Sequence, residues 1–322
     1  MENKKKKKEL LLEAQAFNRR ISERIKAGFI PDLRRAVKCN FFYKSFWRDP
    51  YFARLFLMGQ IEIHLELLKK YGGKHLKILD VGCGPGYISL ELARAGYHIT
   101  GIDIADKAIK AAKNTLAQNP FQDNFGSLQY KVSSLEKMTG KYDVVLFTGV
   151  LHHLTNVESA LQKSNKLLNA TGLILCGEPS YDIWRLEDAS QVAFIRALLS
   201  LTGYWYEKSI ATEIMESEDK FENYTKDVYV EYITERDKNE KHGQSPNDLS
   251  TSGKEILKAL KKNFYQLEYR DGSSFVYRML GGLRGADKEI HKIADLLCLY
   301  ERFAVKKGYL KPSNFFFIGR KK

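Results

Sequence analysis

The chain has 322 residues, enough for one large domain or two modest ones around a sizeable buried core. Its composition, 44% hydrophobic and 28% charged with 7 prolines, is that of a folded globular protein and excludes collagen-like, disordered and disulfide-rich classes. The net charge of +13 is compatible with an anionic partner. However, +4 of this charge stands in residues 1–8, a lysine run that we expect to be a disordered basic tail.

The cysteine content and the hydropathy of the sequence indicate the cellular compartment in which the protein is expected. The four cysteines lie far apart, with neither a CxxC pair nor a histidine at metal-ligand spacing, which favours a reducing compartment without disulfides or a metal site: Cys39, Cys83, Cys176 and Cys298. No apolar run reaches the ~18 residues of a membrane span, and the lysine-rich start lacks a signal-peptide pattern. We therefore expect a cytoplasmic protein without a transmembrane segment; the sequence does not indicate its oligomeric state.

Residues 9–73 read as an N-terminal helical cap. Apolar residues recur at spacings of three and four from Leu10 to Ile25, including Phe17 and Ile21, as in an amphipathic helix that ends at Gly28. The arginines Arg20 and Arg24 are assigned to its polar face. A second helix is expected to begin at Asp49-Pro50, an N-cap followed by a favoured first residue, and to end at Gly72-Gly73.

From residue 77 onward, short β-branched runs alternate with helical patterns. Strands are predicted at 78–81, 99–102, 128–132, 143–147 and 173–176, which is typical of a parallel sheet with helical crossovers, an α/β fold. The pattern resumes in residues 251–322, with helices at 251–262 and 286–307 and strands at 264–270 and 315–319. Residues 181–250 interrupt it. Because this stretch is too long for a loop and rich in aromatic residues, we expect a helical lid.

The segment 78–87 combines a strand, a glycine-rich turn and the start of a helix. Gly82, Gly84 and Gly86 let the backbone approach a ligand closely. A dinucleotide fingerprint would need another glycine where Tyr87 stands, and a P-loop would need Gly-Lys-Ser/Thr. Both phosphate-binding interpretations are therefore excluded. Asp103, at the end of the second strand, is placed to accept both hydroxyls of a ribose.

With these residues the chain resembles the class I S-adenosylmethionine-dependent methyltransferases. Further features match that family: the fourth strand running into 148–154, the turn 169–172 before the fifth strand, and Glu178-Pro179 after it. The resemblance covers about residues 78–180 and extends through the last two strands. It implies a Rossmann-like, seven-stranded, mostly parallel sheet with helices on both faces. In that fold, residues 74–180 form the cofactor-binding half and 251–322 the C-terminal part of the core.

The resemblance also implies S-adenosyl-L-methionine as cofactor and assigns site residues. Asp80 and the three glycines would surround its methionyl part, Asp103 would hold the ribose, and Ile104 would pack on the adenine. Ser134 stands where many members have an adenine-binding Asp, so this contact would be weaker and uncharged. Phe147 and Thr148 would line the cofactor from the end of the fourth strand.

Candidates for the acceptor side follow the fourth and fifth strands, at the edge where ligands of open α/β sheets bind. Where the acceptor must lose a proton, the candidate bases are His152, His153 and Glu178, although a histidine pair at this position is also typical of capping and packing. Candidate acceptor-binding residues are Tyr181, Asp182 and Trp184.

We therefore predict methyl transfer to an O, N or C nucleophile by in-line displacement, with a small or lipid-like acceptor that the aromatic insertion would enclose. Methylation of RNA or DNA is the alternative enzyme class, which the charge supports. The fourth strand ends in Phe147-Thr148-Gly149, however, and lacks the turn of the amino-group nucleic-acid methyltransferases. A partner protein that binds S-adenosylmethionine without catalysis is the alternative of another class, which the intact glycine turn disfavours.

Overall fold

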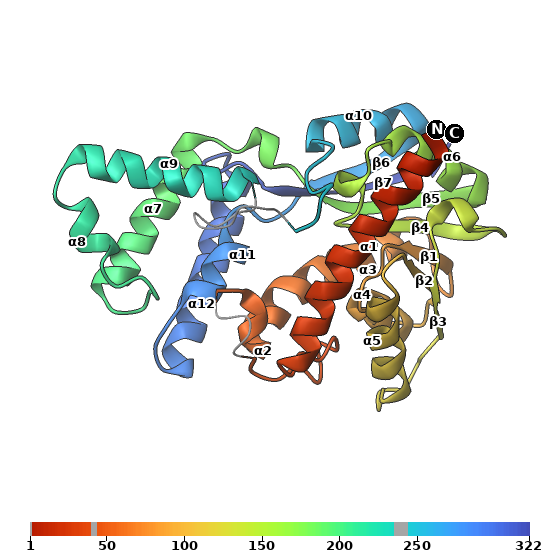
Figure 1. The fold of residues 1–322 in the computed structure, drawn as a ribbon, viewed down its shortest axis with the longest axis horizontal. Coiled ribbons are helices and arrows are strands. Elements are labelled where there is room, and N and C mark those ends of the chain that lie inside the picture. Colours follow the sequence, from red (N-terminus) through yellow and green to blue (C-terminus); the bar gives the residue numbers. More distant parts are fainter. Residues whose placement is uncertain (1, 40–43, 235–243) are drawn as a thin grey trace.

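A computed structural model describes residues 2–39, 44–234 and 244–322, with side chains from residue 8, and centres on a seven-stranded sheet (Figure 1). The strand order is β3-β2-β1-β4-β5-β7-β6, and β7 runs in the opposite direction to the other six strands. This confirms the predicted α/β fold and all seven strands. Their bounds are β1 Lys77–Val81, β2 His98–Asp103, β3 Ser127–Val132, β4 Tyr142–Thr148, β5 Leu168–Pro179, β6 Phe264–Asp271 and β7 Asn314–Lys321.

The sheet is covered on both faces because its central strands are apolar on both sides. On one face, Ile78 and Val144 pack with α3 (Gly59–Tyr71) and α4 (Tyr87–Arg94), and α5 (Asp106–Ala117) lies beside them (Figure 1). On the other face, Leu79 and Val145 pack with α6 (Val157–Leu167) and α10 (Gly253–Asn263). Successive side chains of each central strand thus pack into two separate apolar cores, one on each face of the sheet.

One irregularity lies at the start of β5. Leu168 pairs with Tyr142, and after a register shift Leu173 pairs with Val144. Residues 169–172, expected as a turn before the fifth strand, therefore lie within the bounds of β5 and outside its regular ladder. The predicted strand 173–176 is its regular part.

The N-terminal cap begins with α1 (Glu2–Lys26), which runs diagonally across the sheet's edge in Figure 1. Residues 2–8, expected as part of a disordered basic tail, lie within the bounds of this helix; lysine is a good helix former, and the helix continues into the amphipathic segment. Gly28, with φ of +91°, follows its end. Asp49 accepts a hydrogen bond from the backbone N–H of Tyr51, 2.8 Å away, and Pro50 opens α2 (Pro50–Ala53), as predicted.

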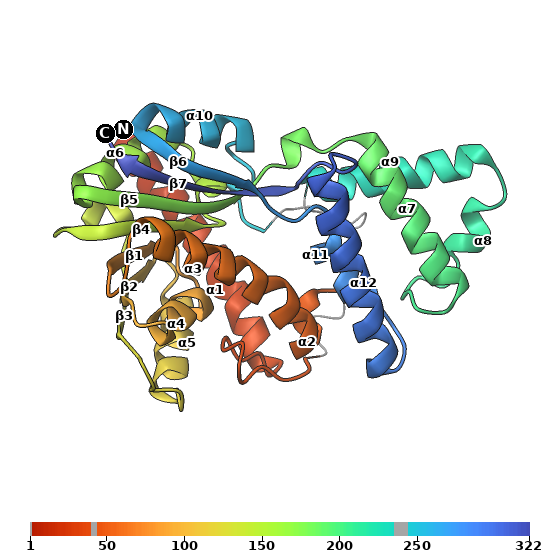
Figure 2. The same ribbon diagram turned by 180° about the vertical axis from the view of Figure 1, so that it is seen from behind.

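The insertion after β5 forms α7 (Leu186–Leu201), α8 (Ile210–Ile214) and α9 (Glu218–Thr234). These helices pack with α2, α11 (Val276–Met279) and α12 (Asp287–Lys306) around a separate apolar core that contains Trp205 and Tyr232. Figure 2 shows this helical body beyond the end of the sheet. Of the residues that follow α9, 235–243 lie outside the described part of the chain. None of the helices in the described part of the chain has both the length and the apolar character of a membrane span.

The amphipathic pattern of α1 yields a test. Ile21 is 4% exposed and packs against Ala105 and Ala108 at the start of α5, whereas Ile25, one turn later, is 43% exposed. Ile21→Asp should lower the free energy of unfolding by about 3 kcal/mol, because it places a charge in an apolar contact. Ile25→Asp should change it by less than about 0.5 kcal/mol. Urea unfolding measures both, and equal effects would contradict this packing of α1.

Candidate functional site

The turn between β1 and α4 contains three glycines in the left-handed region, with φ of +69° at Gly82, +53° at Gly84 and +87° at Gly86. A Cβ at Gly82 would lie 2.5 Å from a methyl group of Val150, and one at Gly86 would lie 2.3 Å from the hydroxyl of Tyr130. At Gly84 a Cβ would meet no protein atom within 4 Å. Gly82 and Gly86 are thus required by packing, while the backbone at Gly84 borders open space.

Asp103, the last residue of β2, fastens this turn to the neighbouring loop. Its Oδ2 accepts a hydrogen bond from the backbone N–H of Gly84 at 2.9 Å, and its Oδ1 accepts one from that of Ala105 at 2.7 Å. Burial raises the pKa of this carboxyl, and the backbone donors offset part of that effect. The carboxylate of Asp103 therefore lies beside the glycine turn, and two backbone N–H groups, one on each side, fix its position.

A cavity of about 300 Å³ opens where β1, β2 and β4 end. Among the residues expected to bind the cofactor, those that line it are Asp80, Gly82, Gly84, Asp103, Ile104, Ser134 and Thr148. Gly86 and Phe147 lie outside this lining. Gly86 precedes α4, where its carbonyl accepts the Tyr130 hydroxyl, and Phe147 is fully buried in the core below the site.

The opposite wall of this cofactor cavity is α1, through Glu13, Phe17, Arg20, Ile21 and Arg24 among others. This corrects the placement of Arg20 and Arg24 on a solvent face. The signal was present in the sequence, because positions 17, 20, 21 and 24 share one helical face. Burial, with a smaller effect of Arg20, lowers the pKa of Arg24 to about 10, so its guanidinium stays charged at neutral pH.

Asp80, at the floor of the cofactor cavity, is 3% exposed and accepts a hydrogen bond from Ser89 at 2.5 Å. Burial raises its pKa to about 7, the Ser89 hydroxyl lowers it in part, and the nearby charge of Asp103 raises it further. Within the described residues Ser89 is its one hydrogen-bond donor, and a single donor does not satisfy a buried carboxylate. This group is therefore poised to meet a cation.

A second cavity, of about 290 Å³, adjoins the first. Both are lined by Phe17, Tyr87, Thr148, Gly149 and His153, so the two spaces meet at these residues. The rest of its wall is strongly aromatic and comes from the cap, the insertion and the C-terminal part of the core: Phe46, Phe56, Tyr181, Tyr277 and Phe316. We call it the aromatic cavity.

Glu178, 1% exposed, organises the loop that separates the two cavities. Its Oε1 accepts the backbone N–H groups of Val150 and Leu151, each at 2.9 Å, and its Oε2 accepts the imidazole Nδ1–H of His152 at 2.9 Å. Because its oxygens are occupied by these donors, this candidate base is a positioning group that fixes the loop and the tautomer of His152.

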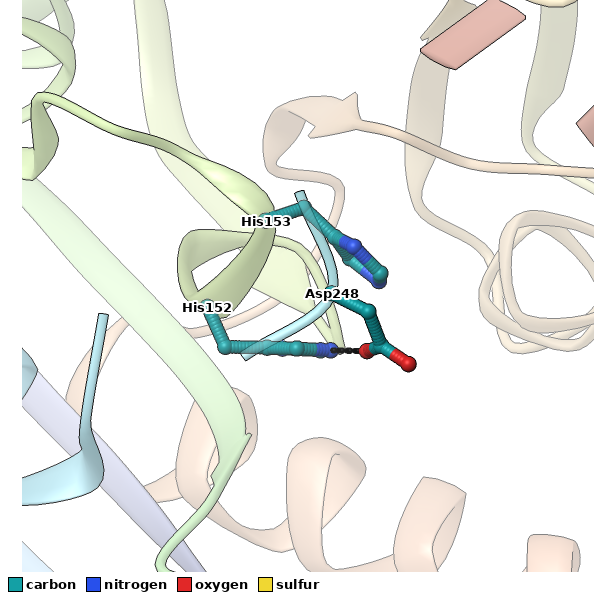
Figure 3. Close-up of side chains that lie close together, drawn as sticks. All are labelled: His152, His153 and Asp248. Carbon is teal, nitrogen blue, oxygen red and sulfur yellow. Dashed lines mark ion pairs between the residues drawn. The ribbon is translucent and has the colours of Figure 1, made fainter. Parts of the chain in front are cut away.

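His152 and His153 lie on the 3₁₀ turn Leu151–His153 with ring centroids 4.1 Å apart. Nδ1 of His153 lies 3.3 Å from Oε1 of Glu13 on α1 and 3.1 Å from the Ser245 hydroxyl. Figure 3 shows both rings directed toward Asp248, with Nε2 of His152 4.0 Å from its Oδ1. The structure thus adds Glu13 and Asp248, which the sequence did not single out, to the predicted histidine pair.

The three residues predicted to bind the acceptor occupy different places. Tyr181 lines the aromatic cavity. Asp182 accepts hydrogen bonds from the backbone N–H groups of Gly253 and Lys254, where α10 begins. Trp184 is 3% exposed, stacks on Tyr232 and donates to Ser274. Only Tyr181 is thus brought to a cavity wall.

The insertion covers the cofactor cavity far less than expected. Among its described residues, only Asn247 lines that cavity, whereas α7–α9 belong to the separate helical body. Their aromatic side chains, such as Trp205 and Tyr232, fill that body's own core. The described helices of the expected lid, residues 181–250, therefore do not line the cofactor cavity, and α1 forms that wall.

Comparison with known proteins supports the nature of this site. A family model described as a methyltransferase domain matches residues 73–266. This range contains the glycine turn, Asp103, Glu178 and the histidine pair, and it spans more than half of the chain.

Individual relatives are similar over shorter stretches. The ubiquinone biosynthesis O-methyltransferase of Pelagibacter ubique (strain HTCC1062) is 33% identical over 103 residues, covering 31% of this chain and 41% of that protein. The mitochondrial ubiquinone biosynthesis O-methyltransferase of Mus musculus is 28% identical over 190 residues, covering 53% of this chain and 50% of that protein. The chain thus spans about half or less of these relatives. A solved S-adenosylmethionine-dependent methyltransferase from Methanosarcina mazei has a TM-score of 0.46 and 17% identity, covering 79% of this chain and 96% of that one.

The raised pKa of Asp80 predicts a pH-dependent cost of folding. Its pKa is about 7 in the folded chain against an ordinary 3.8, so its unfavourable contribution grows as pH rises from about 4 to 7. Asp80→Asn keeps the acceptor for Ser89 and removes the charge. Relative to wild type, the variant should gain roughly 2 to 3 kcal/mol of stability between pH 5 and pH 8. Urea unfolding at both pH values tests this; the exposed Asp123→Asn is the control, and parallel behaviour of the two variants would contradict it.

Proposed function

The chain belongs to the class I S-adenosylmethionine-dependent methyltransferases, and on that premise we propose that it methylates an oxygen of a small, aromatic or lipid-like acceptor. The observation that carries this proposal is the pair of adjoining cavities. One has the charged groups that suit the cofactor, and the other is walled by aromatic rings. The relatives named as O-methyltransferases of ubiquinone biosynthesis support an oxygen acceptor of this kind.

The first cavity fits the cofactor chemically, because Gly84 borders open space and charges of both signs line the walls. When bound, S-adenosylmethionine supplies a methyl group activated by a cationic sulfur. Asp103 would accept the ribose hydroxyls, and Asp80 would accept the methionyl ammonium. Arg20 and Arg24 would pair with the methionyl carboxylate. Ile104 would pack on the adenine, and Ser134 would bond its amino group.

The acceptor lies in the aromatic cavity and meets the methyl group where Phe17, Tyr87 and Thr148 line both spaces. Holding the two reactants in line removes most of the entropic cost of their encounter, and apolar walls exclude water. As the new C–O bond forms and the C–S bond breaks, the acceptor oxygen loses its proton. The imidazoles of His152 and His153 stand at this wall to assist that loss.

Cofactor binding tests the first cavity. Asp103→Ala removes a charged acceptor of two hydroxyls and should weaken binding of S-adenosylmethionine by about 2 kcal/mol, roughly 30-fold. Calorimetry measures the affinity, and thermal unfolding verifies that the variant is folded, since Asp103 also holds Gly84 and Ala105. Asp106→Ala, an exposed neighbour, is the control. Unchanged affinity in folded Asp103→Ala would refute this assignment.

Acceptor binding tests the aromatic cavity. We expect turnover with a panel of phenols and catechols carrying alkyl chains of increasing length, followed by release of S-adenosylhomocysteine. Phe56→Ala should raise KM for the best acceptor several-fold while leaving the cofactor affinity unchanged, because Phe56 lines only the aromatic cavity. Phe194→Ala, on the exposed face of α7, is the matched control. If no member of the panel is methylated, the proposed acceptor class is wrong.

A further inference from the structure

We propose that His152, His153 and Asp248 bind a divalent transition-metal ion of the Zn²⁺ type, which holds the acceptor oxygen in the aromatic cavity. The role toward the acceptor rests on the proposed function, whereas the metal site itself does not. Sequence reasoning predicted no metal site because the cysteines offered none. The structure joins the adjacent histidines to a carboxylate almost 100 residues later in the chain.

The three side chains lie close together (Figure 3). One ring nitrogen of each histidine and one carboxylate oxygen of Asp248 lie within 4.8 Å of one another. The side chains are only 6%, 10% and 2% exposed for His152, His153 and Asp248. Ligands around tetrahedral Zn²⁺ lie ~3.3 Å apart, given bonds of about 2.0 Å. Metal binding therefore requires a contraction of roughly 1 Å, which side-chain movement supplies.

Asp248 provides an independent observation. Its Oδ2 accepts the backbone N–H of Gln244 at 2.6 Å, but its buried Oδ1 has no hydrogen-bond partner within the described part of the chain. A buried carboxylate oxygen without a donor costs free energy, so such atoms are rare. This oxygen is the one that faces Nε2 of His152. A cation between them would satisfy it.

The outer contacts of the two imidazoles are those of metal-bound histidines. Nδ1 of His152 donates to Glu178, and Nδ1 of His153 faces Glu13. Because a carboxylate only accepts, these contacts place the protons on Nδ1 and leave the lone pairs on Nε2. Carboxylates in this position orient a histidine ligand and raise its basicity.

The loop that carries Asp248 is fastened on two sides. Glu13 of α1 accepts the backbone N–H of Asn247 at 3.2 Å and also bonds the Ser245 hydroxyl. Thr251 bonds backbone carbonyls of the 3₁₀ turn region, at His152 and Leu154. The ligand from the insertion is thus held against the histidine pair before any ion binds, which lowers the cost of assembling the site.

The donor set indicates both the metal and its use. Two imidazoles and one carboxylate suit Zn²⁺ and related ions, and three protein ligands leave a position open. Both histidines line the aromatic cavity, so an acceptor hydroxyl can take that position. A bound cation lowers the pKa of the hydroxyl, so the imidazoles assist the loss of its proton by holding the ion, and the proton passes to water. The oxygen then forms its bond to the methyl carbon as the carbon–sulfur bond breaks, and the electron pair neutralises the sulfonium.

Metal binding is tested on the full chain, stripped of metal with a chelator and dialysed. Zn²⁺ is titrated in competition with a chromophoric chelator, and Co²⁺ is added separately to report ligand geometry by its visible absorption. We expect one Zn²⁺ per chain and a four-coordinate Co²⁺ spectrum. Asp248→Ala and His153→Ala should each weaken Zn²⁺ binding by roughly 100-fold, whereas His98→Ala, an exposed histidine on β2, should not.

Thermal unfolding verifies that the variants are folded, and Asp248→Asn serves as a milder second variant. The metal site is refuted if wild type binds no stoichiometric Zn²⁺, or if folded Asp248→Ala and Asp248→Asn both bind it like wild type. Turnover measured in parallel separates the two proposals. Metal-free enzyme that methylates the panel at an undiminished rate refutes the metal's role toward the acceptor and leaves the proposed function. If wild type binds one Zn²⁺ and the variants lose it, but no acceptor of the panel is methylated, the metal site is supported and the proposed function is refuted.

Discussion

The buried carboxylate of Glu178 is the contact on which the arrangement of both cavities depends. It lies at the end of β5 and accepts the backbone N–H groups of Val150 and Leu151 at the end of β4, together with the imidazole of His152. Each of these donors would lose its partner, so removal of the carboxylate would cost several hydrogen bonds at once. The hydrogen bonds to Glu178 therefore fix the loop between the cavities. They also hold Val150 against Gly82 and set the tautomer of His152.

The second organising element is α1, whose Glu13 bonds His153 and the loop at Ser245 and Asn247. The same helix places Arg20 and Arg24 in the cofactor cavity. One helix therefore closes the cofactor cavity and holds the loop of the aromatic cavity. Because its inner face contacts both spaces, displacement of α1 would open the cofactor cavity and loosen the histidine pair together.

The sequence allowed the sheet and the cofactor side to be predicted because both are encoded locally. Strand periodicity and glycine positions depend on neighbours in the chain, so the seven strands, the glycine turn and Asp103 at the end of the second strand could be anticipated. The partners of amphipathic surfaces are not local. A group of aromatic residues such as Trp184 and Tyr232 gives the same sequence pattern whether it covers a ligand or, as here, packs within the protein. Likewise, nothing in the spacing of Asp248 linked it to His152.

The buried carboxylates of the site differ in how many hydrogen-bond donors the protein supplies to them. This difference distinguishes a carboxylate that holds the structure together from one that is placed to bind a ligand. Glu178 is matched by backbone and imidazole donors. Asp80 has one hydroxyl donor and a pKa raised to about 7 by burial, and Asp248 keeps one oxygen without a partner in the described chain. A fold gains nothing by burying an unsatisfied carboxylate, so such groups persist where a ligand completes them. Asp80 lines the cofactor cavity, where it would meet the ammonium of the cofactor, and Asp248 faces His152, where it would meet a metal ion.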